Sequence, residues 1–326
     1  MTTRRALLGA IGAGLVAPQL ALAQPARKVT VVVLSAGEEE DDAPASQPFF
    51  DEMRRLGWVE GTNIAYERFY GRGTREYMDG LAKAAVSRAP DLIYASTANL
   101  ALALVKEPST VPVVFMAVSD PVGTGLVKSL AQPGGNATGV FQSFGEAVQK
   151  RFELIREALP HLQRIGVLLD RRSADHARQK TLHQEAARAT GLELSLVEFI
   201  NFEAVIKAFA NLRRAGVRAA SITPSVTLIA RRREVAEAAA RNRVALAAHR
   251  VEWAEAGAVL TYGAQVADTL RRSAGIVDRI LRGARPADIP VEQSTQAELV
   301  VNQRAAKALG LVLPQTLLRR ADRVIE

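Results

Sequence analysis

The sequence predicts an α/β protein built from two lobes, each with a parallel sheet, and three observations lead to this prediction. From residue 28 onward, short β-branched apolar runs alternate with longer helical patterns, as in parallel strands joined by crossover helices. The alternation forms two successive series, which a stretch rich in glycine and proline separates. A chain of 326 residues is also long enough for about two domains.

The first series starts directly after Lys28. Each of its predicted helices ends at or before a residue that breaks helices, namely Gly57, Pro90 or Pro108. Strands are predicted over residues 29–34, 64–70, 91–95 and 113–118. Helices are predicted over residues 49–56, 76–88 and 100–105.

The stretch from Asp120 to Ser143 separates the two series. It holds two prolines and five glycines, a density of turn residues that indicates a crossing between lobes. In the second series, strands are predicted over residues 165–169, 194–199, 219–223 and 244–247. Helices are predicted over residues 148–159, 174–190, 203–214 and 228–241.

The pattern continues after Ala247, so we expect the chain to revisit the lobes and to form more than one connecting strand. The further elements are an apolar run over 258–262, a helix over 266–282, an extended stretch over 286–292, a strand over 299–302 and a helix over 303–309. We predict that lobe 1 comprises residues 28–142 and 263–290. We predict that lobe 2 comprises residues 143–262 and 291–326, although the pattern leaves open which lobe holds the last strand and helix.

Residues 1–23 have the composition of a signal peptide. Arg4 and Arg5 precede an uncharged apolar run over 6–17, and Ala21-Leu22-Ala23 fits a cleavage site. Twelve apolar residues are too few to span a bilayer. We therefore expect export to the periplasm. The two arginines approximate a twin-arginine signal, and general secretion remains the alternative.

Composition excludes several functional classes. Without residues 1–23, which carry two arginines and no acids, 40 basic and 34 acidic residues leave a net charge of +6. This excess is mild, and the arginine pairs fall in helical patterns beside acidic residues, so no nucleic-acid partner is expected. The chain has no cysteine, which excludes disulfides, thiolate metal sites and a cysteine nucleophile.

Catalytic motifs are also missing from the sequence. There is no GxxxxGK[ST], GxSxG or HExxH pattern. His176 and His183 lie seven residues apart on a polar predicted helix, where surface positions are a simpler interpretation than metal ligation. We therefore expect no catalytic residue, no metal and no cofactor.

Polar residues gather at the carboxyl ends of the predicted strands, where parallel sheets bind ligands. Ser96 and Thr97 precede a helix, so a hydroxyl can cap it while free amides face a carboxylate; capping alone is the alternative. Ser35 opens an acidic stretch that reaches Asp42, predicted as a solvated loop at the cleft edge. Asp120 and Ser143 bound the predicted crossing, and Asp120 can instead fix its turn.

The second series has similar residues at its strand ends. Asp170 can accept a hydrogen bond from a ligand ammonium, whereas Arg171 or Arg172 can meet an anionic group or lie in a solvated loop. The remaining polar residues at these ends are Ser173, Thr223 and Ser225.

Four segments resemble the ABC-transporter substrate-binding proteins of the tryptophan/tyrosine-uptake type. They are DPVGTGLV at 120–127, LAQPGGNATGV at 130–140, ILRGARPADIPVE at 280–292 and AAKALGL at 305–311. The resemblance implies a type I periplasmic binding fold, with two Rossmann-like lobes joined by a three-strand hinge. It also implies a protein that encloses a small solute, delivers it to a permease at the inner membrane and catalyses nothing. We expect the solute to be an amino acid or an organic acid, and the protein to be a monomer.

The resemblance also implies which residues line the cleft. They are Ser96, Thr97, Asp120, Ser143, Asp170, Ser173, Thr223, Ser225 and Tyr262. Two departures concern the solute. The acidic loop after the first strand is atypical, and Arg171-Arg172 replaces an Asn-Pro-like pair, so a carboxylate without an amino group becomes plausible if an arginine points inward.

Two other functions remain open from the sequence. A ligand-sensing module of the same fold would pass its lobe movement to a membrane receptor instead of a permease. An enzyme would use Asp120 or Asp170 as an acid or base, although the missing nucleophile and metal motifs count against it.

Overall fold

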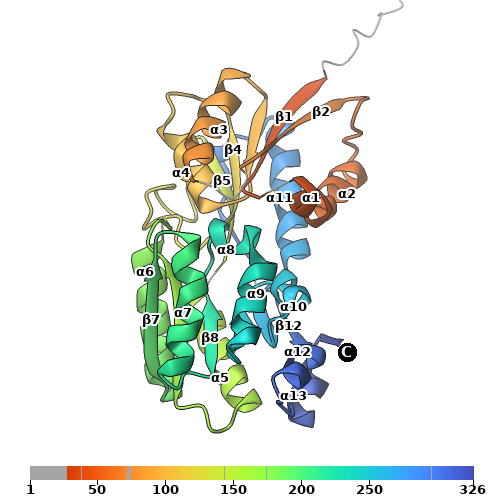
Figure 1. The fold of residues 1–326 in the computed structure, drawn as a ribbon. Coiled ribbons are helices and arrows are strands. Elements are labelled where there is room, and N and C mark those ends of the chain that lie inside the picture. Colours follow the sequence, from red (N-terminus) through yellow and green to blue (C-terminus); the bar gives the residue numbers. More distant parts are fainter. Residues whose placement is uncertain (1–27, 38, 72–74, 143, 174, 295) are drawn as a thin grey trace, which may run out of the picture.

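The computed structural model describes residues 28–37, 39–71, 75–142, 144–173, 175–294 and 296–326. The predicted signal peptide, 1–23, and Ser143 lie outside these residues. Figure 1 shows two lobes, with the N-terminal strands in one and the green central segments in the other. No helix of the described chain is long and apolar enough to cross a membrane.

Lobe 1 contains a six-stranded, all-parallel sheet with the strand order β11-β5-β4-β3-β1-β2. Its strands are β1 (Val29–Ser35), β2 (Ile64–Tyr70), β3 (Leu92–Ala95), β4 (Val113–Val118), β5 (Ala137–Gln142) and β11 (Glu292–Ser294). Its helices are α1 (Glu39–Ala45), α2 (Gln47–Arg55), α3 (Arg75–Ser87), α4 (Ala98–Lys106), α11 (Val266–Leu281) and the 3₁₀ helix η1 (Pro286–Asp288).

Helices cover both faces of this sheet because its central strands are apolar on both sides. Phe115 packs on one face with residues of α3 and α4, such as Met78 and Leu100. Val114 packs on the other face with residues of α2 and α11, such as Phe49 and Ile276. Near-continuous apolar strands are typical of parallel sheets that are buried on both faces.

Lobe 2 contains a seven-stranded sheet in the order β13-β12-β10-β9-β8-β6-β7, in which only the β10–β12 pairing is antiparallel within the described chain. Its strands are β6 (Arg164–Asp170), β7 (Glu193–Phe199), β8 (Ala219–Ile222), β9 (Ala245–Ala248), β10 (Leu260–Ala264), β12 (Ala297–Asn302) and β13 (Arg323–Ile325). Its helices are α5 (Phe144–Ala158), α6 (His176–Thr190), α7 (Phe202–Arg214), α8 (Val226–Ala230), α9 (Arg232–Arg241), α10 (Val251–Ala256), α12 (Gln303–Ala308) and α13 (Gln315–Arg320).

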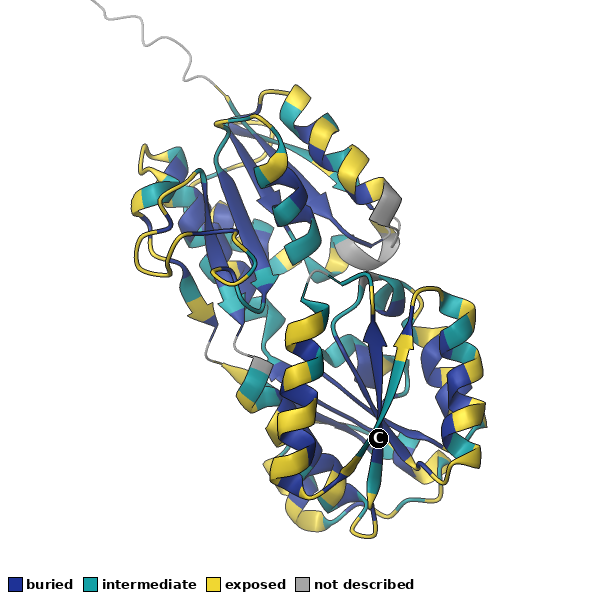
Figure 2. Ribbon diagram, turned by 90° about the vertical axis from the view of Figure 1, so that its left-hand side faces the viewer, coloured by how far each residue is buried: buried dark blue, intermediate teal, exposed yellow. Residues whose placement is uncertain are grey.

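The core of lobe 2 also has two layers. Phe152 of α5 and Leu182 of α6 pack on one face of the sheet, and Phe209 of α7 and Trp253 of α10 pack on the other. Figure 2 shows the buried strands between helices whose outer faces are exposed. The α/β architecture with two mostly parallel sheets confirms the predicted fold class.

The described chain passes between the lobes three times. The first passage follows β5, the second joins β10 to α11, and the third joins β11 to β12. The second and third passages lie together, since the Gln265 backbone N–H donates to the Gln296 carbonyl at 2.9 Å.

The predicted boundary after residue 290 differs from the sheet pairing. Residues 291–326 were predicted in lobe 2, but β11 pairs with β5 in the sheet of lobe 1, with Glu292 opposite Val140. The predicted crossing over 120–143 likewise contains β5, which belongs to that sheet. The strand β5 requires a glycine at position 139, because a Cβ on Gly139 would overlap the Phe115 carbonyl oxygen.

Other expected elements match or differ locally. The strands over 64–70 and 113–118 are confirmed as β2 and β4. The helix over 228–241 is wrong as one element, because the backbone leaves helical geometry at Arg231, between α8 and α9. The acidic loop is wrong over 39–42, where α1 begins, and η1 interrupts the extended stretch over 286–292.

Candidate functional site

A cavity of about 100 Å³ lies between the lobes, at the carboxyl ends of strands from both sheets. Both lobes contribute to its wall. Lobe 1 contributes Ser96, Thr97, Ala98, Asn99, Met116, Ala117, Gln142 and Val266. Lobe 2 contributes Asp170, Ser173, Asp175, Pro224, Ser225, Ile229, His249 and Arg250.

The wall of lobe 1 includes the N-terminus of α4. Thr97 is the N-cap residue, with extended backbone angles, and its Oγ1 accepts a hydrogen bond from the Leu100 backbone N–H at 3.4 Å. The first N–H groups of a helix lack partners within the helix and carry partial positive charge. This wall is therefore suited to a carboxylate.

The end of β4 gives lobe 1 an irregular edge beside the cavity. The register of β4 against β5 shifts between Phe115 and Val118, and Ala117 has a φ of 58°, which is uncommon for a residue with a Cβ. Next to it, Met116 Sδ accepts a hydrogen bond from the Tyr94 hydroxyl at 2.6 Å. A bulge of this kind redirects the side chains that follow it.

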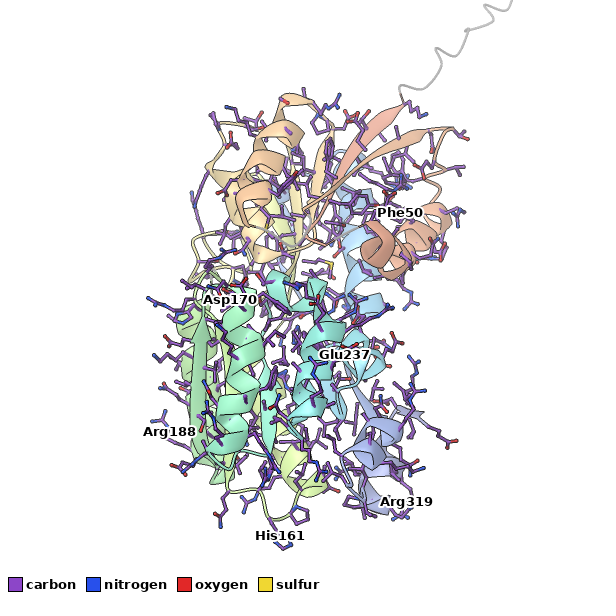
Figure 3. All side chains as sticks on the ribbon, viewed as in Figure 1. Phe50, His161, Asp170, Arg188, Glu237 and Arg319 are labelled. Atoms are coloured by element: carbon purple, nitrogen blue, oxygen red, sulfur yellow. The ribbon has the colours of Figure 1, made fainter. Side chains whose placement is uncertain are left out.

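Lobe 2 contributes two carboxylates. Asp170, at the end of β6, is 4% exposed and accepts hydrogen bonds from Ser225 Oγ at 2.7 Å and the Arg172 backbone N–H at 2.9 Å. Figure 3 shows it where the lobes face each other. Both of these hydrogen-bond donors are uncharged groups.

Asp175 is the second carboxylate. It accepts hydrogen bonds from Ser173 Oγ at 2.5 Å and Gln179 Nε2 at 2.9 Å, both in lobe 2. It also accepts one from Ser119 Oγ at 2.7 Å, which comes from lobe 1.

His249 and Arg250 complete the polar wall of lobe 2. Burial, together with the positive charges of Arg151 and Arg250, lowers the pKa of His249 to about 3, so its ring is neutral at pH 7. Arg250 forms an ion pair with Glu252. Burial alone would raise the pKa of Glu252. The positive charge of Arg250 and its hydrogen bond to Glu252 outweigh burial, so the pKa is lowered to about 2.

A buried polar cluster lies behind His249. His183 is fully buried, with Nδ1 2.7 Å from the Gln179 carbonyl oxygen, so its predicted surface position is wrong: the polar predicted helix hides a buried face. Burial and the Arg151 charge lower the pKa of His183 to about 3. Arg151 is 1% exposed, and burial lowers its pKa to about 10. Its Nε and Nη1 have no hydrogen-bond partner among the residues that the structure describes.

Five of the predicted site residues line the cavity. They are Ser96, Thr97, Asp170, Ser173 and Ser225. Ser143 lies outside the described residues, and the other five predicted residues are not part of the cavity wall. Ser35 is buried at the end of β1, Thr223 donates to the Leu168 carbonyl at 2.7 Å, and Arg171 is exposed.

Asp120 and Tyr262 are the remaining predicted residues outside the cavity wall. Asp120 Oδ1 accepts a hydrogen bond from the Gly123 backbone N–H at 2.7 Å, so it fixes the turn after β4. A side chain on Gly123 would overlap that carboxylate.

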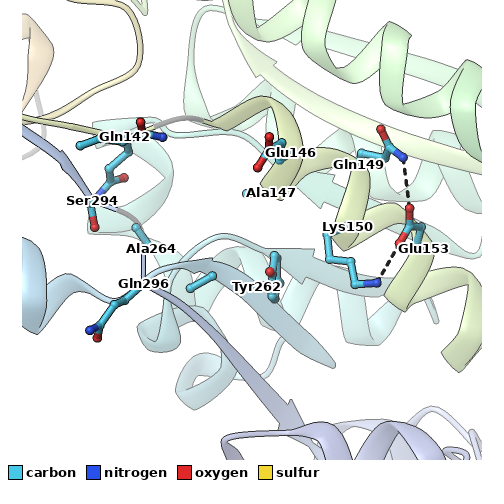
Figure 4. Close-up of a pocket in the computed structure, with 12 residues that line it drawn as sticks. Gln142, Glu146, Ala147, Gln149, Lys150, Glu153, Tyr262, Ala264, Ser294 and Gln296 are labelled. Atoms are coloured by element: carbon cyan, nitrogen blue, oxygen red, sulfur yellow. Dashed lines mark hydrogen bonds and ion pairs between the residues drawn. The ribbon is translucent and has the colours of Figure 1, made fainter. Parts of the chain in front are cut away.

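Tyr262 lines a different cavity, of about 410 Å³, between α5 and the segments that join the lobes (Figure 4). There Glu153 accepts hydrogen bonds from Lys150 Nζ at 2.9 Å and Gln149 Nε2 at 3.2 Å. Gln142 lines both this hinge pocket and the cleft.

Sequence reasoning missed several cleft residues. Asp175, His249 and Arg250 follow strand ends at a short distance, and this position is the signal that could have found them. Asn99 lies in the first turn of α4, directly after the predicted pair Ser96 and Thr97. Met116 and Ala117 gave no signal, because only the bulge turns them toward the cleft. Among the described residues, no group of acidic or histidine side chains could hold a metal ion.

The chain belongs to the family described as ABC transporter substrate binding protein, which it matches over residues 28–325. It is 25% identical over 268 residues to a tyrosine-binding protein of Clostridioides difficile (strain R20291), covering 82% of this chain and 76% of that one. Its fold is the type I periplasmic binding fold, as in solved sugar-binding proteins of ABC transporters.

Two similar solved structures represent a ligand complex and a ligand-free protein. A Streptococcus pneumoniae domain in complex with L-Trp is similar with a TM-score of 0.84 at 22% identity, covering 91% of this chain and 100% of that one. The ligand-free, open structure of a Clostridium difficile substrate binding protein gives a TM-score of 0.67 at 22% identity, covering 91% and 99%. This chain therefore superposes better on the complex than on the open structure.

Proposed function

We propose that this protein binds an L-amino acid between its lobes as the extracytoplasmic component of an ABC import system. One observation carries the proposal: the two walls of the cleft have opposite polarity. The N-terminus of α4 faces the cleft from lobe 1, and the buried carboxylate of Asp170 faces it from lobe 2.

An amino acid matches both walls at once. Its carboxylate can accept hydrogen bonds from the amides of α4, as anions do at helix N-termini. Its ammonium can donate to Asp170, which is buried and accepts hydrogen bonds from two uncharged donors, Ser225 Oγ and the Arg172 backbone N–H. A solute that contacts both lobes binds the closed form better than the open form, and so shifts the population toward closure.

A carboxylate without an amino group fits this cleft less well. Arg171 is exposed and lies outside the cavity wall, and Arg250 is already paired with Glu252. Such a solute would leave Asp170 without a cation and place a second negative charge near it. The tyrosine-binding relative and the L-Trp complex support the amino-acid interpretation.

The remaining parts of the proposal concern the setting. The predicted signal peptide, 1–23, would direct the protein to the periplasm, where the closed monomer would deliver its solute to a permease at the inner membrane. No cofactor takes part. A ligand-sensing module would bind the same solute, so cross-linking in cells distinguishes the two functions by capturing either a permease or a receptor.

Thermal unfolding with added solutes tests the proposal. The protein is first unfolded and refolded to release any solute that it retained, and its melting temperature is then measured with each common L-amino acid and with matched carboxylic acids that lack the amino group. A ligand that binds only the folded state raises the melting temperature. We expect a rise with at least one L-amino acid and none with its deaminated analogue. A rise with the analogue alone, or with no amino acid, would overturn the proposal.

A further inference from the structure

A direct hydrogen bond joins the two lobes across the cleft. Ser119 follows β4 of lobe 1, Asp175 precedes α6 of lobe 2, and Ser119 Oγ donates to Asp175 Oδ2 at 2.7 Å. Both side chains are partly buried. The contact joins two protein atoms, so it needs no solute atom to form.

The lobe 2 half of this contact is fixed in place. Ser173 Oγ donates to Asp175 Oδ1, and Nε2 of Gln179, which is 1% exposed, donates to Asp175 Oδ2. Although Asp175 occupies the N-cap position of α6, its side chain makes no capping hydrogen bond. The carboxylate therefore does not cap the backbone of α6, and it accepts instead from the side chains of Ser173, Gln179 and Ser119.

The lobe 1 half is positioned by an irregular backbone. The register shift in β4 and the positive φ of Ala117 precede Ser119 directly. Such backbone conformations cost free energy and persist where the surroundings enforce them. The turn that follows is fixed as well, since Asp120 accepts hydrogen bonds from the Gly123 backbone N–H and from Thr124 Oγ1, each at 2.7 Å.

We propose that the Ser119–Asp175 hydrogen bond is a latch that stabilises the closed arrangement of the lobes by itself. A fraction of the solute-free molecules is then closed. Solute binding supplies only the remaining free energy that closure of the other molecules needs. Ser119 lies outside the cavity wall, so it affects solute affinity as a positioning residue, through the fraction of protein in the closed form.

The inference does not depend on the identity of the solute, so it can be tested without one. The natural chain has no cysteine, and two introduced cysteines are therefore unique attachment points for spin labels. Lys83 on α3 and Arg188 on α6 are exposed residues in different lobes. The Lys83→Cys, Arg188→Cys protein, refolded without solute, reports the distance between the lobes by pulsed electron paramagnetic resonance.

The distance distribution is compared between this labelled protein and the same protein with Ser119→Ala or Asp175→Ala. A hydrogen bond to a charged group is worth enough to change the ratio of closed to open protein by about tenfold. We expect a short-distance, closed population in the parent protein. In each single variant the ratio of closed to open protein should fall about tenfold. The double variant should show no further fall, because both substitutions remove the same interaction.

Ser129→Ala is the matched control. Ser129 Oγ donates to the Gln132 carbonyl at 3.0 Å within lobe 1, so this variant should keep the parental distribution. Circular dichroism verifies that each variant is folded. The latch is refuted if the solute-free parent shows only the long distance, or if Ser119→Ala leaves the distribution unchanged. Either result would leave amino-acid binding intact, because the thermal measurements test that function separately.

Discussion

The two walls of the cleft differ in their polar groups. Lobe 1 presents the amides of α4 and neutral side chains such as Ser96 and Met116, whereas lobe 2 presents Asp170, Asp175 and a buried polar cluster behind them. All four histidines of the sequence also fall within the segments that build lobe 2. We therefore expect a solute to contact backbone amides in lobe 1 and charged side chains in lobe 2, and we expect the two lobes to respond differently to pH and to substitution.

Acid should destabilise lobe 2 first, and this is the largest effect we expect. The pKa values of His183 and His249 are lowered by burial to about 3, whereas an unfolded histidine has a pKa of about 6.5. Between pH 6.5 and 3 the unfolded state binds more protons, so stability falls as the pH decreases through this window. At pH 5 the loss is on the order of 2 kcal/mol for each histidine.

Urea unfolding at pH 7 and pH 5 measures this loss, and hydrogen exchange locates it. The pKa of the Glu252 carboxyl group is lowered to about 2, so Glu252 reduces the unfolding free energy mainly below pH 4.5. Above that pH, the loss of unfolding free energy comes from the two histidines. Faster exchange at pH 5, after correction for the intrinsic rate, should appear in lobe 2. Equally faster exchange in both lobes at pH 5 would contradict the expectation that the buried histidines make lobe 2 the acid-sensitive lobe.

Removing the charge of Asp170 should weaken solute binding strongly. In Asp170→Asn the side chain keeps its size but loses the charge that we assign to the solute ammonium, and affinity should fall roughly 10- to 100-fold. Calorimetric titration with the amino acid found by thermal unfolding measures the change. Asp120→Asn is the matched control, since Asp120 fixes a turn outside the cavity wall. A similar loss in both variants would contradict the assignment.

Truncating the cap of α4 should cost stability and affinity together. Thr97→Ala removes the oxygen that accepts from Leu100, a change worth about 1 kcal/mol of unfolding free energy. Asn201→Ala removes the equivalent cap of α7, where Asn201 Oδ1 accepts from Ala204 at 3.0 Å. Urea unfolding should show similar losses for both, but only Thr97→Ala should weaken solute binding. If Asn201→Ala weakened binding equally, α4 would have no special role.

Arg151 should contribute little to stability, which is the smallest effect we expect. Its buried guanidinium has two nitrogens without partners, and unpaired buried charge costs free energy. In Arg151→Met an apolar side chain fills much of the same space, so the unfolding free energy should stay unchanged or rise by about 1 kcal/mol. A loss above about 2 kcal/mol would contradict this expectation and show that the guanidinium stabilises the fold.

The regular elements could be predicted from sequence because their signals are local. The strands β2 and β4 match their predicted ranges, since apolar runs with clear ends determine them. The strand β5 was missed because its segment looks like a turn: Gly139 is there for the close approach of Phe115 and not for flexibility. The two-lobed fold follows from the order of elements, but the partner of β11 does not.

The candidate site was predictable only in part, for a similar reason. Strand-end position found Asp170 and Ser225, but it cannot give the direction of a side chain. Thr223 and Arg171 have the same position along their strands, yet one faces a backbone carbonyl and the other faces solvent. Burial of His183 and Arg151 depends on the packing of α5 and α6 against the sheet, which no local pattern encodes.

The late position of α11 and β11 in the chain has a consequence for biosynthesis. Both elements complete lobe 1, where Trp58 Nε1 donates to Asp278 Oδ1 at 2.8 Å and α11 covers one face of the first sheet. When the ribosome has released only the chain up to β5, α2 alone covers part of that face and the β5 edge has no neighbour. Lobe 1 therefore finishes folding after most of lobe 2 has been translated, and in the meantime its apolar sheet is a target for chaperones.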